Sequence, residues 1–180
     1  MLGSPRYFSY IYDVNKEIKV MRNRLEILEQ IKTINKSGGV YKWYITPEGA
    51  KSLNIPVNGT TMKNGLHLVY VGLSKNLRQR LNWHCGDQHR PSSIKSGTLS
   101  VLRQKINALL TDRWDNRELV DDFMNQHMLV EFEYSEDYEA LELTEINNNK
   151  LPLNARNNPN FTEFRRFLSK KNGQAKRNSL

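Results

Sequence analysis

The fold is decided by one stretch near the middle of the chain, Leu68-Val69-Tyr70-Val71-Gly72-Leu73-Ser74-Lys75-Asn76-Leu77-Arg78-Gln79-Arg80-Leu81-Asn82-Trp83-His84. Residues 66–71 predict a short apolar strand that ends at Gly72, and residues 75–84 predict a helix after a polar turn. Arg80 and His84 are four residues apart, so they share one face of that helix. A basic helix face next to a strand end suits the binding of a phosphate group.

Two further strands are predicted around this stretch. Residues 39–45 are rich in aromatic and β-branched side chains. Residues 128–134 alternate in the manner of a strand, which places Leu129, Glu131 and Glu133 on the face opposite to Val130, Phe132 and Tyr134. Residues 46–65 are rich in Gly, Pro, Asn and Thr and predict a loop. Because no helical pattern separates the first two strands, we expect them to form an antiparallel hairpin with an inserted loop.

Helices are expected around these strands. Apolar periodicity predicts them over residues 98–111, 117–126, 137–147 and 160–171. Residues 14–34 predict an amphipathic N-terminal helix, with Asp13 as its N-cap and an apolar stripe at Ile18, Met21, Leu25, Leu28 and Ile31. The predicted fold is α+β, a small antiparallel three-stranded sheet flanked by helices, with an extra N-terminal helix. We expect a helical extension over residues 1–37, one domain over 38–168 and a frayed basic tail over 169–180.

Composition narrows the class of protein. The chain has 180 residues, enough for one domain with a sizeable core, and its formal charge is +8. A basic chain suits a nucleic-acid partner, although many soluble proteins are basic for other reasons. Cys85 is the single cysteine, so an intrachain disulfide is excluded, and no apolar run approaches the ~20 residues that span a bilayer. We therefore expect a reducing, cytoplasmic compartment and no membrane partner.

Several side chains could take part in phosphodiester chemistry. The Arg80 guanidinium could bind two phosphate oxygens, or it could belong to a solvated helix face. Tyr41 and Tyr70 could converge on one edge of the sheet, or they could pack against each other as cross-strand neighbours. Glutamates recur every third residue from 139 to 145, where one of them could hold a divalent cation or all could be solvated.

Taken together, these segments resemble the GIY-YIG nuclease superfamily. Gly39-Val40-Tyr41 is similar to the first signature of the family and Tyr70-Val71-Gly72 to the second, each with Val in the usual Ile position. The remaining positions of the family pattern are matched in order by Arg80, His84, Glu142, Ile146 and Asn154. Leu151-Pro152-Leu153-Asn154 also resembles a group of small stand-alone bacterial members. The resemblance runs from about residue 38 to 168, with longer segments at 46–65 and 86–135 than in compact members.

The resemblance implies a role for each matched residue. Glu142 would be the single protein ligand of a Mg²⁺ or Mn²⁺ ion, and Arg80 would stabilise charge on the phosphate. Tyr41 would act as general base or orient the attacking water, with help from Tyr70 or His84. Gly72 would allow a close approach of the backbone where the strand turns into the helix, and Asn154 would brace the site.

The function expected from these residues is that of a metal-dependent endonuclease that hydrolyses DNA phosphodiester bonds, in restriction, repair or junction processing. The alternative is a non-catalytic nucleic-acid-binding module on the same scaffold. The expected partner is double-stranded or branched DNA, with the protein in the cytoplasm, or at the nucleoid of a bacterium, and homodimerisation is left open. Candidate nucleic-acid contacts are Lys75, Arg78, Arg90, Lys95 and Arg103.

Overall fold

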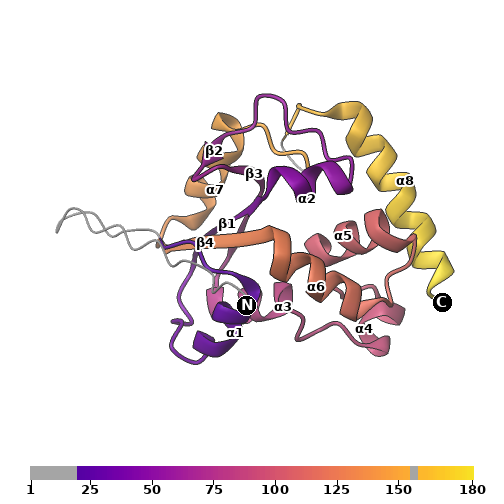
Figure 1. Ribbon diagram of the computed structural model, residues 1–180. Helices are drawn as coiled ribbons and strands as arrows, with labels where there is room; N and C mark the ends of the chain where they lie inside the picture. The colour runs from indigo at the N-terminus through magenta and orange to yellow at the C-terminus, as the bar shows by residue number, and fades with distance from the viewer. Residues whose placement is uncertain (1–19, 155–157) are drawn as a thin grey trace, which may run out of the picture.

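The computed structural model describes residues 20–154 and 158–180. Over these residues the chain forms an α+β domain in which helices flank one antiparallel sheet (Figure 1). The sheet has four strands in the described part of the chain, in the order β2-β3-β1-β4, where the sequence predicted three. The missed strand, β2 (Met62–Lys63), pairs with the start of β3 (Leu66–Ser74) through a tight turn at Asn64-Gly65. Both turn residues have positive φ, which is the conformation that this dipeptide favours.

The central strand, β1 (Gly39–Ile45), has the bounds that the sequence predicted, and so does β4 (Met128–Tyr134). Both neighbours of β1 run antiparallel to it, which confirms the expected hairpin. The prediction that the strand after residue 66 ends at Gly72 is wrong, because β3 continues through Gly72 to Ser74. Gly72 lies opposite Tyr41 within the β1–β3 pair, so the glycine belongs to the sheet and not to a turn.

Two glycines in the sheet stand where the fold has no room for a side chain. A Cβ on Gly39 would lie 2.1 Å from the Glu133 carbonyl oxygen, and one on Gly72 would lie 2.4 Å from the Tyr41 hydroxyl oxygen. Both positions are close approaches between neighbouring strands. The glycines of the two signatures therefore have a packing reason in this fold.

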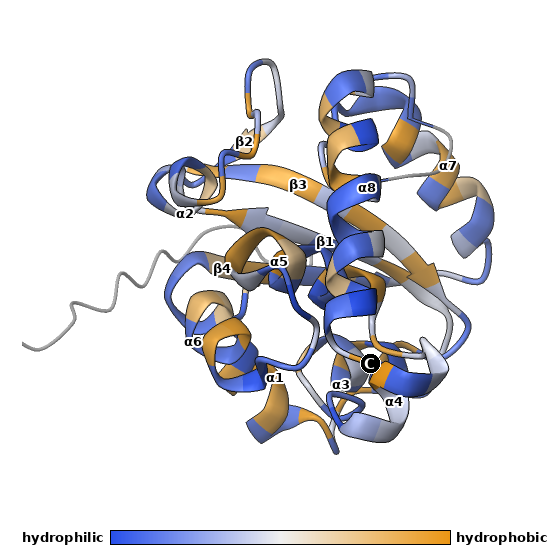
Figure 2. Cartoon of the chain, turned by 90° about the vertical axis from the view of Figure 1, so that its right-hand side faces the viewer, coloured by the Kyte–Doolittle hydropathy of each residue, from blue (hydrophilic) through white to orange (hydrophobic). Residues whose placement is uncertain are grey.

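Separate hydrophobic cores lie on the two faces of the sheet. The larger one is built on Tyr41, Trp43 and Ile45 and is covered by α1 (Arg24–Gln30), α3 (Leu77–His84), α5 (Val101–Thr111) and α6 (Arg117–His127). The smaller one is built on Val40 and Tyr44 and is covered by α7 (Tyr138–Asn148). In Figure 2, α5 lies against the sheet with much of its visible surface coloured as apolar.

The register of β1 and β3 shifts between Trp43 and Tyr44, where Val69 has no partner on β1. This irregularity keeps Tyr70 on the face of Tyr41 and moves Leu68 to the opposite face, where it joins the smaller core. Residues of β3 on both sides of the shift, Val71 and Leu68, therefore pack in the smaller core under α7.

Two short helices lie in segments that were predicted to be irregular. They are α2 (Pro47–Ser52), within the predicted loop 46–65, and α4 (Pro91–Ser96), between the predicted helices 75–84 and 98–111. Each has proline at its first position, where the fixed φ of proline suits a helix and the missing N–H costs nothing. Thr46 caps α2 by accepting a hydrogen bond from Gly49 N at 3.0 Å.

The N-terminal helix is much shorter than the predicted span of residues 14–34. Part of that span, with Asp13 and Ile18, lies outside the described residues. Arg22 forms a bridge to Val130 of β4, and α1 begins only after Asn23, which makes a reciprocal capping box with Glu26. The buried residues of the helix are Arg24 and Ile27, whereas Leu25 of the predicted stripe is exposed.

The last helix extends beyond the predicted 160–171. Helix α8 (Thr162–Asn178) packs against α5 and runs through most of the segment that was expected to fray. Trp114 fixes its end, because the indole N–H donates to Asn172 at 2.9 Å and the Trp114 backbone N–H donates to Ser179 Oγ at 2.6 Å. Within the described residues, no helix combines the length and apolar character needed to cross a bilayer.

The close approach at Gly39 makes a prediction about stability. We expect Gly39→Ala to lower the free energy of unfolding by about 1–3 kcal/mol, because the new Cβ meets a backbone oxygen that cannot move alone. Gly173→Ala in α8 is the matched control: its Cβ has room, and we expect a gain of about 0.5–1 kcal/mol from helix propensity. Urea denaturation of both variants measures the difference, and equal effects would contradict the packing argument.

Candidate active site

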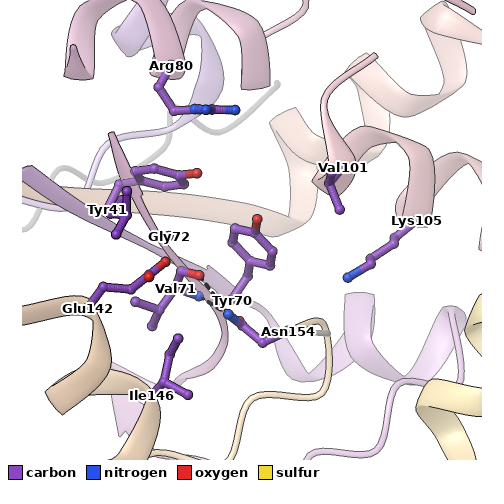
Figure 3. A pocket seen from close by; sticks show the side chains of 11 residues that line it. Tyr41, Tyr70, Val71, Gly72, Arg80, Val101, Lys105, Glu142, Ile146 and Asn154 are labelled. Atoms are coloured by element: carbon purple, nitrogen blue, oxygen red, sulfur yellow. Dashed lines mark hydrogen bonds between the residues drawn. The ribbon is translucent and has the colours of Figure 1, made fainter. Parts of the chain in front are cut away.

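One cavity of about 490 Å³ opens where β1, β3, α3, α5 and α7 meet. Five of the six predicted catalytic residues line it, namely Tyr41, Tyr70, Arg80, Glu142 and Asn154. Figure 3 shows Arg80 and Glu142 on opposite sides of the two tyrosines. Residues that are far apart in the sequence are thus gathered in one hollow, which is the arrangement that the register of the motifs predicted.

The two strands bring the tyrosines together. Tyr41 on β1 and Tyr70 on β3 have ring centroids 6.3 Å apart with planes inclined by 29°. Tyr41 lies opposite Gly72, whose missing side chain leaves the space that the phenol occupies. The two rings therefore pack against each other and also line the cavity, so both alternatives considered for these tyrosines apply.

His84 does not line the cavity but lies directly behind Tyr41. It is buried, its Nε2 is hydrogen-bonded to the Tyr41 hydroxyl at 2.9 Å, and its Nδ1 is hydrogen-bonded to Ser100 Oγ at 2.6 Å. Ser100 is also the N-cap of α5, so the start of that helix fixes the imidazole. Burial, together with the positive charges of Arg80 and Arg103, lowers the pKa of His84 to about 3. The imidazole is therefore neutral at physiological pH.

Tyr41 is also held in its neutral form. Burial of the hydroxyl, and then the neighbouring Tyr70, raise the pKa of Tyr41 well above its usual value, although the charge of Arg80 opposes them. The carboxylate of Glu142 raises this pKa further. A phenolate at Tyr41 is thus disfavoured by the site as it stands.

Arg80 and Glu142 supply opposite charges to the two sides of the cavity. Arg80 comes from α3, and its guanidinium lies over the Trp83 ring with its central carbon 5.1 Å from the ring centroid. Glu142 comes from α7, on the opposite face of the sheet, and Figure 3 shows its carboxylate directed toward Tyr41 and Gly72. The cavity therefore has a guanidinium on one side and a carboxylate on the other.

Glu142 fits the single-carboxylate ligation of a divalent metal. Among residues 20–154 and 158–180, no group of three or more His, Cys, Asp or Glu side chains is placed to hold a metal ion. Mg²⁺ is commonly bound in this way, through one or two carboxylates with water and substrate phosphates as the other ligands. The donor set of this cavity suits such an ion and does not suit a closed structural metal site.

Asn154 secures the edge of β3. Its side chain accepts a hydrogen bond from Val71 N at 2.9 Å and donates one to Val71 O at 2.8 Å, while Leu153 N donates to Val69 O at 3.0 Å. The short β2 covers only the first residues of β3, so this segment pairs with the edge where β2 has ended. Asn154 thus holds the backbone next to Gly72 in place.

Comparison with known protein families matches residues 39–174 to the GIY-YIG catalytic domain. The chain belongs to the GIY-YIG family. No curated protein and no solved structure gives a match. The family is one of endonucleases, so the domain is a nuclease domain whose substrate is nucleic acid.

The GIY-YIG motif pattern left two residues of the site unnoticed. Ser100 orients His84, and Lys105 lines the cavity from α5 with its side chain largely buried. Both lie between the second signature and Glu142, in a segment that the motif spacing does not cover. A signal for Lys105 was present, since it follows Leu102 by three residues and so falls on the apolar side of the predicted helix.

The structure separates the candidate nucleic-acid contacts. Lys75, Arg90 and Lys95 are exposed, whereas Arg78 is partly buried and donates hydrogen bonds to two backbone carbonyls. The assignment of Arg103 is wrong, because its side chain is fully buried.

Arg103 has a structural role instead. Its guanidinium is paired with Asp121 and hydrogen-bonded to His89 and to the backbone of His84. The sequence could not distinguish this residue from a surface arginine, since its partners come from other elements.

The two buried histidines of the GIY-YIG domain make the stability depend on pH. Burial lowers the pKa of His84 to about 3 and that of His89 to about 4, below the value of about 6.5 in an unfolded chain. Between those values the unfolded state binds the extra proton, so the free energy of unfolding falls as the pH falls below about 6.5. We expect each histidine to contribute about 1.4 kcal/mol per pH unit in that window.

Urea denaturation between neutral pH and about pH 4.5 measures this slope. We expect His84→Gln to reduce the dependence of the free energy of unfolding on pH by the contribution of one histidine, because glutamine can still form hydrogen bonds but does not titrate. Equal slopes in the two proteins would show that His84 is not held neutral by the fold.

Proposed function

We propose that the protein is a metal-dependent endonuclease that hydrolyses DNA phosphodiester bonds at this cavity. The observation that carries the proposal is the convergence of Tyr41, Arg80 and Glu142 on one hollow from three different elements. Phosphodiester hydrolysis needs a positioned water, positive charge at the phosphate and a cation-binding carboxylate. The net charge of +8 suits DNA as the substrate.

Arg80 is the phosphate-binding group in this proposal. Its guanidinium stays protonated and can donate two parallel hydrogen bonds to phosphate oxygens. The stacking of Arg80 on Trp83 limits the rotamers of the side chain and so reduces the entropy lost when a phosphate binds. The negative charge that develops in the transition state would then meet a cation already in place.

The Tyr41–His84–Ser100 chain can position the water and receive its proton. In the tautomer with a proton on Nδ1, Ser100 Oγ accepts from His84 and the Tyr41 hydroxyl donates to Nε2. A lone pair of the Tyr41 oxygen is then available to accept a hydrogen bond from the attacking water. As the proton of the water passes to Tyr41, the proton of Tyr41 can pass to Nε2, so that no free phenolate is needed. The incoming phosphate charge would favour the imidazolium that results.

Glu142 would hold the divalent ion, Mg²⁺ or Mn²⁺, on the α7 side of the cavity. Such an ion, when bound, supplies positive charge that stabilises the scissile phosphate and the leaving oxygen. Restriction, repair and junction processing all remain compatible with these groups, since the choice among them depends on recognition by other surfaces.

Removal of the Glu142 carboxylate is the sharpest test. We expect Glu142→Gln to reduce nicking of supercoiled and branched DNA in Mg²⁺ or Mn²⁺ by at least about 10³-fold, since one ligand and one charge are lost together. Glu139→Gln is the matched control, because that glutamate is exposed on the same helix and does not line the cavity, and it should cut like the parent. Thermal unfolding of all three proteins checks that the fold is kept.

Equal cleavage by the parent and Glu142→Gln would show that the catalytic centre lies elsewhere. Salt-dependent DNA binding by the parent protein with no cleavage in either metal would favour the alternative, a nucleic-acid-binding module that keeps the GIY-YIG scaffold.

A further inference from the structure

Lys105 is a buried cation for which the described part of the chain provides no counter-ion. Lys105 is 8% exposed, and its ammonium donates one hydrogen bond to the Leu153 carbonyl oxygen. The ammonium also lies 5.8 Å from the centroid of the Tyr70 ring. Among the described residues, no carboxylate forms an ion pair with Lys105. Buried lysines are normally paired, so this one calls for an anion that residues 20–154 and 158–180 do not supply.

A second cation faces the same space from α8. Lys105 and Arg165 both line a cavity of about 210 Å³ between α5, α8 and the segment that ends at Asn154. Arg165 is partly buried, and its positive charge, after burial itself, contributes to lowering the pKa of Lys105 to about 8. Two cations that oppose each other in one hollow are stabilised together when an anion lies between them.

This smaller cavity continues the catalytic one. The two share Val101, Lys105 and Asn154 as lining residues, so a ligand can extend from Arg80 past Tyr70 to Arg165 without leaving the surface hollow. Val101 is exposed at the boundary between them and offers an apolar contact there. A groove with cations along its length and an apolar residue between them matches the alternation of phosphate and sugar in one nucleic-acid strand.

We propose that Lys105 and Arg165 bind a backbone phosphate of the DNA strand being cut, next to the phosphate that Arg80 holds. The identity of the ligand rests on the proposed function, whereas the need for an anion rests on the unpaired charge alone. The site positions the strand in the catalytic cavity and takes no part in the chemistry. The hydrogen bond to Leu153 accounts for one donor of the ammonium and leaves two for phosphate oxygens.

The test is the salt dependence of binding to a labelled duplex of about 20 base pairs, followed by fluorescence anisotropy in EDTA from about 50 to about 300 mM NaCl. Each phosphate contact that is lost should reduce the slope of log K against log salt by about one. We expect Lys105→Gln and Arg165→Gln each to show that reduction, with affinity lowered several-fold at low salt, and Lys105→Arg to restore the slope.

Arg166→Gln is the matched control, because it removes an exposed arginine from the adjacent position of α8 that lines neither cavity. The proposal would be overturned if the salt slopes of Lys105→Gln and Arg165→Gln were the same as that of Arg166→Gln. So would a loss of thermal stability in Lys105→Gln with an unchanged slope, which would mark the lysine as a tie to Leu153 only. The proposal would also be overturned if inorganic phosphate bound at Lys105 and Arg165 while the substitutions left the salt slope of DNA binding unchanged. That result would mean that the site binds a free anion.

The same measurements separate this proposal from the proposed nuclease activity. Glu139→Gln should bind DNA in EDTA with the slope of the parent protein, because Glu139 is exposed and lines neither cavity. If the parent protein does not cleave DNA but the Lys105 and Arg165 variants show the expected slopes, the proposed nuclease activity is rejected. The proposed strand-binding site is then still supported.

Discussion

The pairing of Tyr41 with Gly72 across β1 and β3 is the constraint on which the site depends. A tyrosine can lie flat over a neighbouring strand only where that strand offers no side chain, and a Cβ at Gly72 would fall within 2.4 Å of the phenol oxygen. The phenol then reaches His84, and through it the start of α5 at Ser100. The glycine of the second signature thus sets the position of the tyrosine of the first, and both set the position of the helix that completes the cavity.

Two elements outside the signatures make this arrangement firm. Asn154 binds both backbone groups of Val71 and replaces the strand that β2 is too short to provide. The buried Arg103–Asp121 pair joins α5 to α6 and also holds the carbonyl of His84. Because removing one partner of such a buried polar interaction is costly, the site depends on residues outside the two signatures.

The central strands of the sheet could be predicted from the sequence, because their side chains follow a regular pattern over several residues. β1 and β4 have the predicted bounds, and the motif spacing gathered five residues that do line one cavity. Short elements carry too few residues for periodicity, so α2, α4 and β2 were missed although Pro47, Pro91 and Asn64-Gly65 marked them. Burial of charge was the other failure: Arg103 was predicted to contact nucleic acid, because only the packing of α5 against α6 reveals that its side chain is buried.

The division of the core into two clusters has a consequence for motion. Arg80, His84 and Tyr41 belong to elements of the larger core, while Glu142 is carried by α7, in which Ile146 is the one buried residue. A salt bridge from Lys42 to Glu145 and the small cluster around Ile146 hold that helix to the sheet. Free energies of local opening follow the apolar area that an element buries, so α7 can detach at lower cost than α5 or α6, which each bury several apolar residues. The Glu142 carboxylate would then leave the cavity while the side that carries Arg80 stays folded, which makes the helix a point at which the proposed activity could be interrupted without denaturing the domain.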